Sequence, residues 1–302
     1  MSAPVRYFHR ARRTVEEEQI YGESALRWTY ETGLGQVALA ALVKRPAFSH
    51  WFGWRMNRPS SKALIAPFIR DYQLDEAEFA DTADSFSSFN AFFYRKLKAS
   101  ARPIDSTPGV VVFPADGRHF CIPQLGSETR VFAKGQAFDL PKLLGNATLA
   151  KDFYGGSMVM SRLCPVDYHR FHFPCAGTPS AAMSLHGSLF SVSPIALSRR
   201  LAYLWENKRM LTILETSAFG RIAILEIGAT CVGSIHQTFS PYQPVLAGSE
   251  KGYFSFGGSC VITVFQANRL RIDDDILAAS SEGLESYAKM GERLGCVPTE
   301  NS

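Results

Sequence analysis

Hydrophobic residues recur at helical spacing through roughly the first third of the chain. Between residues 88 and 96 they lie three and four positions apart, which is the period of one helix face. Ser88 is a favourable N-cap for this helix, and Pro103 closes it. The face that it would bury carries Phe89, Phe92, Phe93 and Lys96. The pattern therefore predicts a helical N-terminal segment up to about residue 100.

The spacing changes after residue 105, where short runs of β-branched and apolar residues lie between Gly, Pro and Asp. Few good helices separate these runs, so we expect a mostly antiparallel sheet. The predicted strands are residues 110–113, 157–161, 211–214, 222–227 and 260–265.

Close to the C-terminus, apolar residues return to helical spacing. They predict a short amphipathic helix that includes Leu284, Tyr287, Ala288, Gly291 and Leu294. The expected fold class is α+β, with a helical N-terminal segment on a β-rich, mostly antiparallel body and a short C-terminal helix. We place the boundary between residues 1–105 and residues 106–302.

Composition favours a folded protein of a reducing compartment. The chain has 302 residues, 46% of them hydrophobic, which is enough for a sizeable core. Its six cysteines form no CxxC pair, so we expect mostly buried free thiols. The N-terminus lacks the apolar core of a signal peptide, and the apolar stretch 34–43 is shorter than the roughly 18 to 20 residues of a membrane span. We therefore expect a cytoplasmic protein without a span, which leaves contact with a membrane surface open.

Positive charge is concentrated in one window. The net charge is +4, yet residues 32–70 contain six Lys or Arg and no Asp or Glu, so this window carries +6 and the remainder −2. Aromatic residues are interleaved with these cations, which suits an interface with anionic lipid head groups. A solvated helix face beside a core explains the pattern equally well, and nothing accompanies the window that is typical of nucleic-acid binding. The aromatic residues are Phe48, Trp51, Phe52, Trp54 and Phe68.

Two polar groups beside apolar runs are candidates for chemistry. Asp116 in the segment PADGRHF follows an expected strand, although a turn-forming role explains it more simply. His169 and His172 in DYHRFHFP would share one side of a helical turn but face opposite sides of a strand. No further His or Cys lies at ligand spacing, so a zinc site is disfavoured.

The third candidate is the glycine pair before Ser259. Asp, His and Ser side chains can form a hydrolase triad in any chain order, but Ser259 lacks the GxSxG pattern of a nucleophile elbow. A glycine before a serine permits another reaction, because it lets the backbone adopt a strained geometry. The Ser259 hydroxyl could attack the carbonyl of Gly258 and form an ester, whose elimination splits the chain and leaves a pyruvoyl group. The residues thus suggest self-cleavage.

Six segments in order resemble the phosphatidylserine decarboxylase family, which is pyruvoyl-dependent, over nearly the whole chain. The last of these segments, at residues 256–260, resembles the shorter bacterial branch of that family, in which the cleavage site has the sequence FGGS instead of LGS. The segments are SFNAFFYRKLKASARPID (88–105), PADG (114–117), DYHRFHFPCAG (167–177), HGSLFSV (186–192), VGSIHQTFSP (232–241) and FGGSC (256–260).

The resemblance implies a role for each candidate residue. Asp116 would be the charge-relay aspartate, His172 its histidine and Ser259 the self-cleaving serine, with the scissile bond after Gly258. His169 would act in the decarboxylation step, since imidazole titrates near working pH. Cleavage would give a large chain of residues 1–258 and a small chain of residues 259–302.

One departure from the family pattern follows the serine. The family usually has Thr or Ser there, whereas this chain has Cys260. Its thiol could attempt an acyl shift of its own at the bond between residues 259 and 260.

The implied reaction converts phosphatidylserine to phosphatidylethanolamine and CO2 through a Schiff base with the pyruvoyl group. Neither a metal nor PLP would be needed. The implied location is the cell membrane, as a peripheral protein of its cytoplasmic side bound to phosphatidylserine in an anionic bilayer, and residues 1–105 would be the membrane-docking segment. The implied assembly is a homodimer, without nucleic acid as a partner. Candidate substrate-binding residues in the matching segments are His186, Ser188, Phe190 and His236.

Three other functions stay open on the residues alone. The chain could be a pyruvoyl-dependent decarboxylase of a soluble amino acid, although the basic aromatic window argues against this. It could also be a lipid-binding homologue that does not cleave, or a conventional serine hydrolase.

Overall fold

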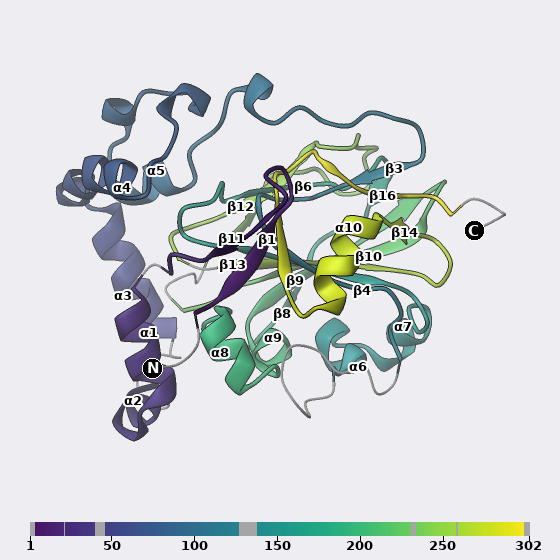
Figure 1. Cartoon of the computed structure of the whole chain (residues 1–302), viewed down its shortest axis with the longest axis horizontal. Coiled ribbons are helices and arrows are strands. Elements are labelled where there is room, and N and C mark those ends of the chain that lie inside the picture. Colours follow the sequence, from purple (N-terminus) through teal and green to yellow (C-terminus); the bar gives the residue numbers. More distant parts are fainter. Residues whose placement is uncertain are drawn as a thin grey trace.

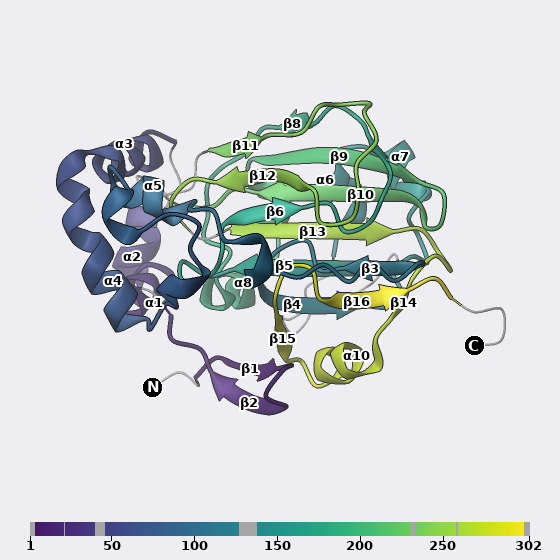
Figure 2. The same ribbon diagram turned by 90° about the horizontal axis from the view of Figure 1, so that it is seen from above.

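A ten-stranded sheet lies at the centre of the computed structural model (Figures 1 and 2). Its strand order is β2-β1-β15-β4-β5-β13-β10-β9-β7, and β8 also pairs with β9. Neighbouring strands are antiparallel, except β1 and β15, which are parallel. The prediction of a mostly antiparallel α+β fold is confirmed. The structure describes residues 4–20, 22–39, 46–126, 138–230, 234–257 and 259–298, apart from the side chains at 46 and 48.

All five predicted strands are present, with small shifts at their ends. The strands of the large sheet are β1 (Arg6–His9), β2 (Thr14–Glu17), β4 (Gly117–Ile122), β5 (Met158–Leu163), β7 (Thr178–Pro179), β8 (Met183–Leu185), β9 (Arg209–Thr216), β10 (Gly220–Ile227), β13 (Ser259–Phe265) and β15 (Glu285–Ala288). Two smaller sheets have the orders β11-β12-β6 and β14-β16-β3. Their strands are β3 (Val110–Val112), β6 (Arg170–His172), β11 (Ile235–Gln237), β12 (Glu250–Phe254), β14 (Arg271–Ile272) and β16 (Arg293–Cys296).

The large sheet is covered on both faces, which explains why every residue of β13 is buried. Successive side chains of a strand point to opposite faces. Ile262 and Val264 accordingly join one hydrophobic cluster, whereas Val261 and Phe265 join another. The first cluster includes residues of α6 (Leu140–Leu144), α7 (Ala147–Lys151), α8 (Pro194–Arg199) and α9 (Tyr203–Glu206). The second includes residues of the two smaller sheets and of α10 (Asp274–Ser281).

The N-terminal helices gather at one end of the sheet in both views (Figures 1 and 2). They are α1 (Glu23–Glu31), α2 (Gly33–Ala38), α3 (Pro46–Asn57), α4 (Ile65–Asp71) and α5 (Phe89–Phe93). Ser88 caps α5 as predicted, because its hydroxyl accepts a hydrogen bond from the backbone N–H of Ala91. The helix is shorter than predicted and ends at Phe93, so Lys96 lies beyond it. A third hydrophobic cluster joins α3, α4 and α5 to Phe256, which lies shortly before β13.

The structure differs from the sequence prediction near both ends of the chain. Residues 6–17 form the hairpin β1–β2 at the edge of the large sheet and are not helical. The predicted helix across residues 284–294 is wrong, because this segment forms β15, a turn and β16, while the C-terminal helix α10 precedes it. Gly291 makes the turn at φ +89°, and a Cβ there would lie 2.5 Å from the carbonyl oxygen of Pro103. Apolar residues three and four apart fit this strand-turn-strand unit as well as a helix.

Five of the six cysteines lie within the described residues. Cys121, Cys164, Cys175, Cys260 and Cys296 are free thiols, and all but the last are buried. Cys231 lies outside the described residues. Within the described ranges, no helix has the length and apolar character needed to cross a bilayer.

Candidate active site

Ser259 is the first residue of β13 and is completely buried. Its strand lies between β10 and β5, and Ser259 stands opposite Leu163 of β5. The six residues that follow, CVITVF, are all buried. Packing on both faces and pairing on both sides therefore hold the backbone that carries this hydroxyl.

His169 provides the polar contact of the Ser259 side chain. Its Nδ1 lies 3.3 Å from the Ser259 hydroxyl oxygen, and its Nε2 lies 2.9 Å from the carbonyl oxygen of Cys164. A carbonyl only accepts, so Nε2 carries the proton and Nδ1 presents its lone pair to Ser259. The ring stacks on Phe93 of α5 with 3.9 Å between centroids. Burial lowers the pKa of His169 to about 3, so the ring is neutral at pH 7.

The loop before Ser259 is tied to the helical segment. The backbone N–H of Phe256 donates to Asn90 Oδ1 at 2.8 Å, and Asn90 Nδ2 donates to Asn57 Oδ1 at 2.7 Å. Gly257 has φ +135°, a conformation that L side chains rarely adopt. Rings of α3 and α5 surround Phe256, namely Phe52, Phe89 and Phe93. Gly258, the predicted residue before the scissile bond, lies outside the described residues.

Asp116 is buried immediately before β4 and forms no hydrogen bond with a histidine of the described residues. Both of its carboxylate oxygens accept from Arg102, at 2.8 Å and 2.9 Å from Nε. The backbone N–H of Met290 also donates to Asp116 Oδ1 at 2.8 Å. This aspartate is therefore more than the turn former that its local sequence suggests.

His172, at the end of β6, is the second residue of the predicted relay. Its backbone N–H donates to the carbonyl oxygen of Pro114, close to Asp116 in the chain, and its ring stacks on Tyr168. Its buried Nδ1 has no hydrogen-bond partner. Burial lowers the pKa of His172 to about 4, which leaves the ring neutral at pH 7. The structure thus brings Ser259 to His169 and shows no direct hydrogen bond between the side chains of Asp116, His172 and Ser259 among the described residues.

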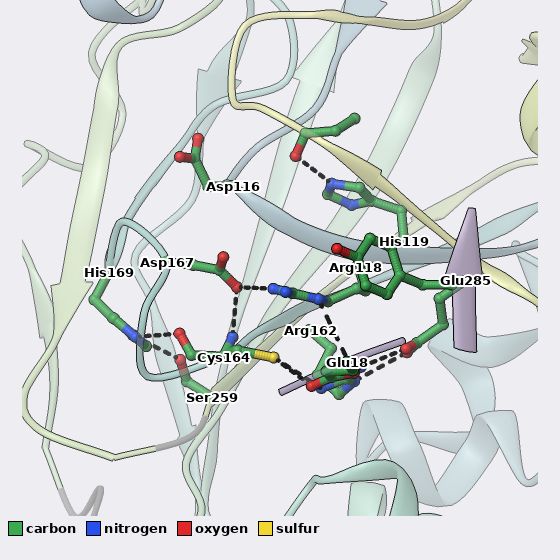
Figure 3. Close-up of polar contacts among 12 residues, drawn as sticks. Glu18, Asp116, Arg118, His119, Arg162, Cys164, Asp167, His169, Ser259 and Glu285 are labelled. Carbon is green, nitrogen blue, oxygen red and sulfur yellow. Dashed lines mark hydrogen bonds and ion pairs between the residues drawn. The ribbon is translucent and has the colours of Figure 1, made fainter. Parts of the chain in front are cut away.

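A buried ionic network surrounds the segment between β5 and His169 (Figure 3). Arg118 donates to Asp167 Oδ2 at 2.6 Å, and the same oxygen accepts from the backbone N–H of Cys164 at 2.7 Å. Arg162 joins Glu18, which follows β2, to Glu285 of β15. In Figure 3, Asp116 stands apart from Ser259, while Asp167 and Cys164 lie between the arginines and His169.

The network joins Glu18, near the N-terminus, and Glu285 of β15 to the surroundings of the site. Burial alone would raise the pKa of Glu18, but attraction to Arg162 outweighs it and lowers the pKa to about 2. Burial raises the pKa of Asp167, although Arg118 opposes the shift. Sequence reasoning missed these residues, since Glu18 and Arg162 are 144 positions apart and neither belongs to a local motif. Within the described residues, no group of three His, Cys, Asp or Glu side chains could hold a metal ion.

A largely apolar cavity of about 240 Å³ lies beside Ser259. Gly257 lines it on one side, and the strand partner Leu163 lines it on another. Helices α1 and α3 contribute Leu26 and Phe52. The cavity therefore connects the helical segment to the surroundings of the candidate nucleophile. Its remaining lining residues are Glu18, Ile20, Gly22, Ala25, Arg162, Cys164, Pro165, Ser191, Val192, Ser193, Thr230 and Phe256.

The predicted substrate-binding residues do not line this cavity, although the residues directly after Phe190 do. His186 is exposed, and Ser188 pairs with Asn207 as an isolated bridge. Phe190 stacks on Tyr203 at 4.2 Å between centroids, which is a packing role. His236 is exposed on β11, stacks on Tyr253 and contacts the Ser255 hydroxyl at 3.0 Å. Their part in substrate binding stays a prediction.

Comparison with known proteins identifies the family of the chain. The family model described as phosphatidylserine decarboxylase matches residues 89–296. A phosphatidylserine decarboxylase proenzyme of Chlamydia pneumoniae is 43% identical over 278 residues, which cover 92% of each chain. Proenzymes of the same name from Desulfitobacterium hafniense and Clostridium botulinum are 39% and 40% identical over 96% of this chain and 98% and 99% of theirs. With this family model and these relatives over almost its full length, the chain belongs to the phosphatidylserine decarboxylase family.

Proposed function

We propose that the chain is a phosphatidylserine decarboxylase that makes its own pyruvoyl group by cleavage between Gly258 and Ser259. It would convert phosphatidylserine to phosphatidylethanolamine and CO2. The observation that carries this proposal is the contact between the buried Ser259 hydroxyl and the unprotonated Nδ1 of His169. This contact lies at the start of a central strand, in a chain that belongs to the family.

The cleavage chemistry balances with these residues. The Ser259 hydroxyl oxygen attacks the carbonyl carbon of Gly258, and the peptide C–N bond breaks as the ester C–O bond forms. The proton taken from the hydroxyl ends on the new amine. Loss of the Cα proton of Ser259 then expels the Gly258 carboxylate and leaves dehydroalanine. Uptake of one water and release of one ammonia give the pyruvoyl group.

The two histidines have different places in this scheme. The resemblance assigns proton removal in the precursor to His172 with Asp116, and the free Nδ1 of His172 is available for it. The 3.3 Å contact adds a task for His169, which orients the Ser259 hydroxyl. After cleavage the same Nδ1 still faces the first atoms of β13. Because the ring is neutral at pH 7, it could accept the proton that the substrate's ammonium group releases on binding to the ketone, and return that proton to the substrate carbon after CO2 has left.

The pyruvoyl group would supply a ketone that binds the substrate's amine and accepts the electrons released with CO2. The residues around Ser259 fit this group. Pairing of β13 with β10 and β5 would hold the new N-terminus, and the adjoining cavity is lined largely by apolar side chains. Exclusion of water from such a site favours loss of a carboxylate.

Large and small chains would stay together after cleavage. The small chain, residues 259–302, contains β13 and β15, and both lie between strands of the large chain. Arg162 of the large chain also binds Glu285 of the small chain at 2.5 Å. Cleavage would therefore break one peptide bond and leave the pairing of these strands intact.

A membrane-docking surface on the helical segment supports a lipid substrate. Trp51 and Trp54 of α3 are exposed, and Arg58 lies over the ring of Trp54 at 4.4 Å. Further exposed apolar residues of this segment are Trp28, Leu34, Val37 and Leu64, and its exposed cations include Arg55, Lys62 and Arg70. Phe68 instead packs in the core, and Lys44 and Arg45 lie outside the described residues. We infer a peripheral position on the cytoplasmic side of an anionic membrane. The homodimer that the resemblance implies also stays a proposal.

Mass spectrometry of the purified protein tests the proposed function. We expect two polypeptides of 258 and 44 residues, the smaller with a blocked pyruvoyl N-terminus that borohydride and phosphatidylserine together tag. An intact chain of 302 residues would instead favour a lipid-binding homologue that does not cleave. Cleavage without CO2 release from phosphatidylserine would favour a soluble amino acid as substrate.

A further inference from the structure

A second cavity, of about 470 Å³, adjoins the same segment of chain as the first. Cys164 and Pro165 line the first cavity, whereas the next residues, Val166, Asp167 and Tyr168, line the second. The second cavity also reaches Asp116. In contrast to the first, its walls are mostly polar and include several arginines: Arg12, Arg95, Arg102 and Arg118.

Arg95 is the notable group in this wall. Its side chain is buried, with 5% of its surface exposed, and its Nε and Nη1 have no hydrogen-bond partner. The guanidinium lies over the rings of Phe79 and Phe92, at 4.9 Å and 4.7 Å from their centroids. The stem is thus fixed by aromatic packing while two donors remain unused. Burial lowers the pKa of Arg95 to about 10, so the group is still charged at pH 7.

The neighbouring carboxylates are already paired with other cations. Asp116 binds Arg102, and Asp167 binds Arg118. Glu78, also in the wall, binds Arg102 and Lys289. Among the described residues, no carboxylate forms an ion pair with Arg95 within 4.0 Å. A buried charge without a partner is costly, which indicates a counter-ion that binds in the cavity.

We propose that Arg95 binds a phosphate-type oxyanion in this second cavity. A guanidinium presents two parallel N–H donors to one phosphate along its Nε/Nη2 edge or its Nη1/Nη2 edge, and each of these edges of Arg95 carries one of the two unused donors. Hydroxyl groups that can complete the site come from two tyrosines of the wall, Tyr168 and Tyr287, whereas the hydroxyl of Tyr7 already donates to Glu16 at 2.9 Å. The phosphate can be free or part of a phosphoserine head group, and the second source rests on the proposed function.

Calorimetry with inorganic phosphate tests the site on the purified full chain. We expect saturable binding of one phosphate, weakened at least about tenfold by Arg95→Met, because a charge-assisted hydrogen bond is lost. Methionine keeps an apolar stem between the two phenylalanine rings. The matched control is Arg271→Met, which removes an exposed arginine of β14 and should bind phosphate as the unmodified chain does. Absent or non-saturable binding, or equal affinity of Arg95→Met, would overturn the proposal.

A second variant and a competition measurement complete the test. Should Arg95→Met not fold, as judged by circular dichroism, Arg95→Lys decides, since it keeps the charge but loses the fork. Affinity should again fall, and unchanged affinity would count against the site. Glycerophosphoserine then identifies the source: competition with phosphate supports a head-group site, and phosphate binding without competition supports a site for free phosphate. These measurements need no turnover, so failure of the site and failure of the proposed function are separate results.

Discussion

At the scale of single residues, the tautomer of His169 determines what it can do for Ser259. Its Nε2–H is committed to the carbonyl of Cys164, and this bond leaves Nδ1 as the acceptor that faces the hydroxyl. Stacking on Phe93 fixes the ring plane. The residue is therefore oriented from three sides, as expected of a group that must meet a reacting atom.

Replacing His169 by Asn should separate cleavage from decarboxylation. Asn is too short to reach the reacting carbon, so we expect CO2 release from phosphatidylserine to fall about a hundredfold or more. Cleavage should continue, more slowly, because His172 and Asp116 remain. The comparison variant is His172→Asn, which should stay uncleaved in denaturing electrophoresis. Full decarboxylase activity of cleaved His169→Asn would contradict the role given to His169.

The buried histidines also predict how stability depends on pH. His119 Nε2 donates to the carbonyl oxygen of Ala288 at 3.2 Å, so Nδ1 of the neutral ring accepts from the Ser161 hydroxyl at 2.9 Å. Burial lowers the pKa of His119 to about 3. The unfolded chain takes up this proton near pH 6.5 and the folded chain does not, so folding loses stability as pH falls below 6.5.

Denaturant unfolding of the unmodified chain and of His119→Asn between pH 6 and 4.5 would measure the contribution of His119 to this pH dependence. The free energy of unfolding should fall more steeply for the unmodified chain, by about 1.4 kcal/mol per pH unit. His119→Asn will be less stable at pH 7 because its hydrogen bonds change, but this offset does not depend on pH. Parallel curves for the two proteins would show that His119 is protonated in the folded state.

At the scale of elements, the sequence was most informative where one face or both faces of a strand are apolar. The five predicted strands all have continuous hydrophobic runs, such as β13 and β10. β4 was not predicted, because Gly117, Arg118 and His119 interrupt its pattern although all three are buried. Their partners, Asp167 and Ser161, are more than 40 positions away and cannot be recognised locally.

Within the candidate site, the sequence likewise identified some residues and missed others. Motifs identified Asp116, His169, His172 and Ser259, because their residue types are suited to the proposed chemistry. Supporting residues such as Arg102 and Asn90 were not found, because their role is defined only by what the fold brings beside them. The contact of Ser259 with His169 instead of His172 likewise depends on how the loop before β6 turns.

Helix α5 holds the cleavage loop and should influence the rate of cleavage. Asn90→Ala removes the acceptor of the Phe256 N–H, so the residues before the scissile bond lose a fixed position. We expect cleavage to slow about tenfold, since one buried hydrogen bond contributes roughly 1 kcal/mol or somewhat more. The time course of precursor loss after synthesis in a cell-free system would measure this.

Asn57→Ala is the control for this variant. It removes the second partner of Asn90 but leaves the bond to Phe256, so its effect should be clearly smaller. Equal slowing by both variants would point to general loosening of α5 and α3 instead of positioning of the loop.

At the scale of the whole molecule, the helical segment joins the proposed membrane surface to the site. Phe52 of α3 lines the cavity beside Ser259 and stacks on Phe256 with 5.5 Å between centroids. Trp51 and Trp54 of the same helix are exposed, by 51% and 56%. One helix therefore carries both the exposed indoles and a side chain that lines the cavity.

Flotation with vesicles containing phosphatidylserine tests this arrangement in the complete, cleaved enzyme. Two exposed indoles that insert at the interface contribute apolar area to binding, so the double change Trp51→Ser and Trp54→Ser should reduce the bound fraction about tenfold or more. Neutral vesicles should bind the unmodified enzyme more weakly, because its cations then lack lipid partners. Tyr242→Ser removes an aromatic ring that is 67% exposed on the catalytic body and should float as before. If the tryptophan variant floats equally well, another face of the molecule meets the membrane, and α3 serves only to pack against Phe256. If it stops floating yet still decarboxylates a short-chain, water-soluble phosphatidylserine, membrane docking and decarboxylation are separable functions.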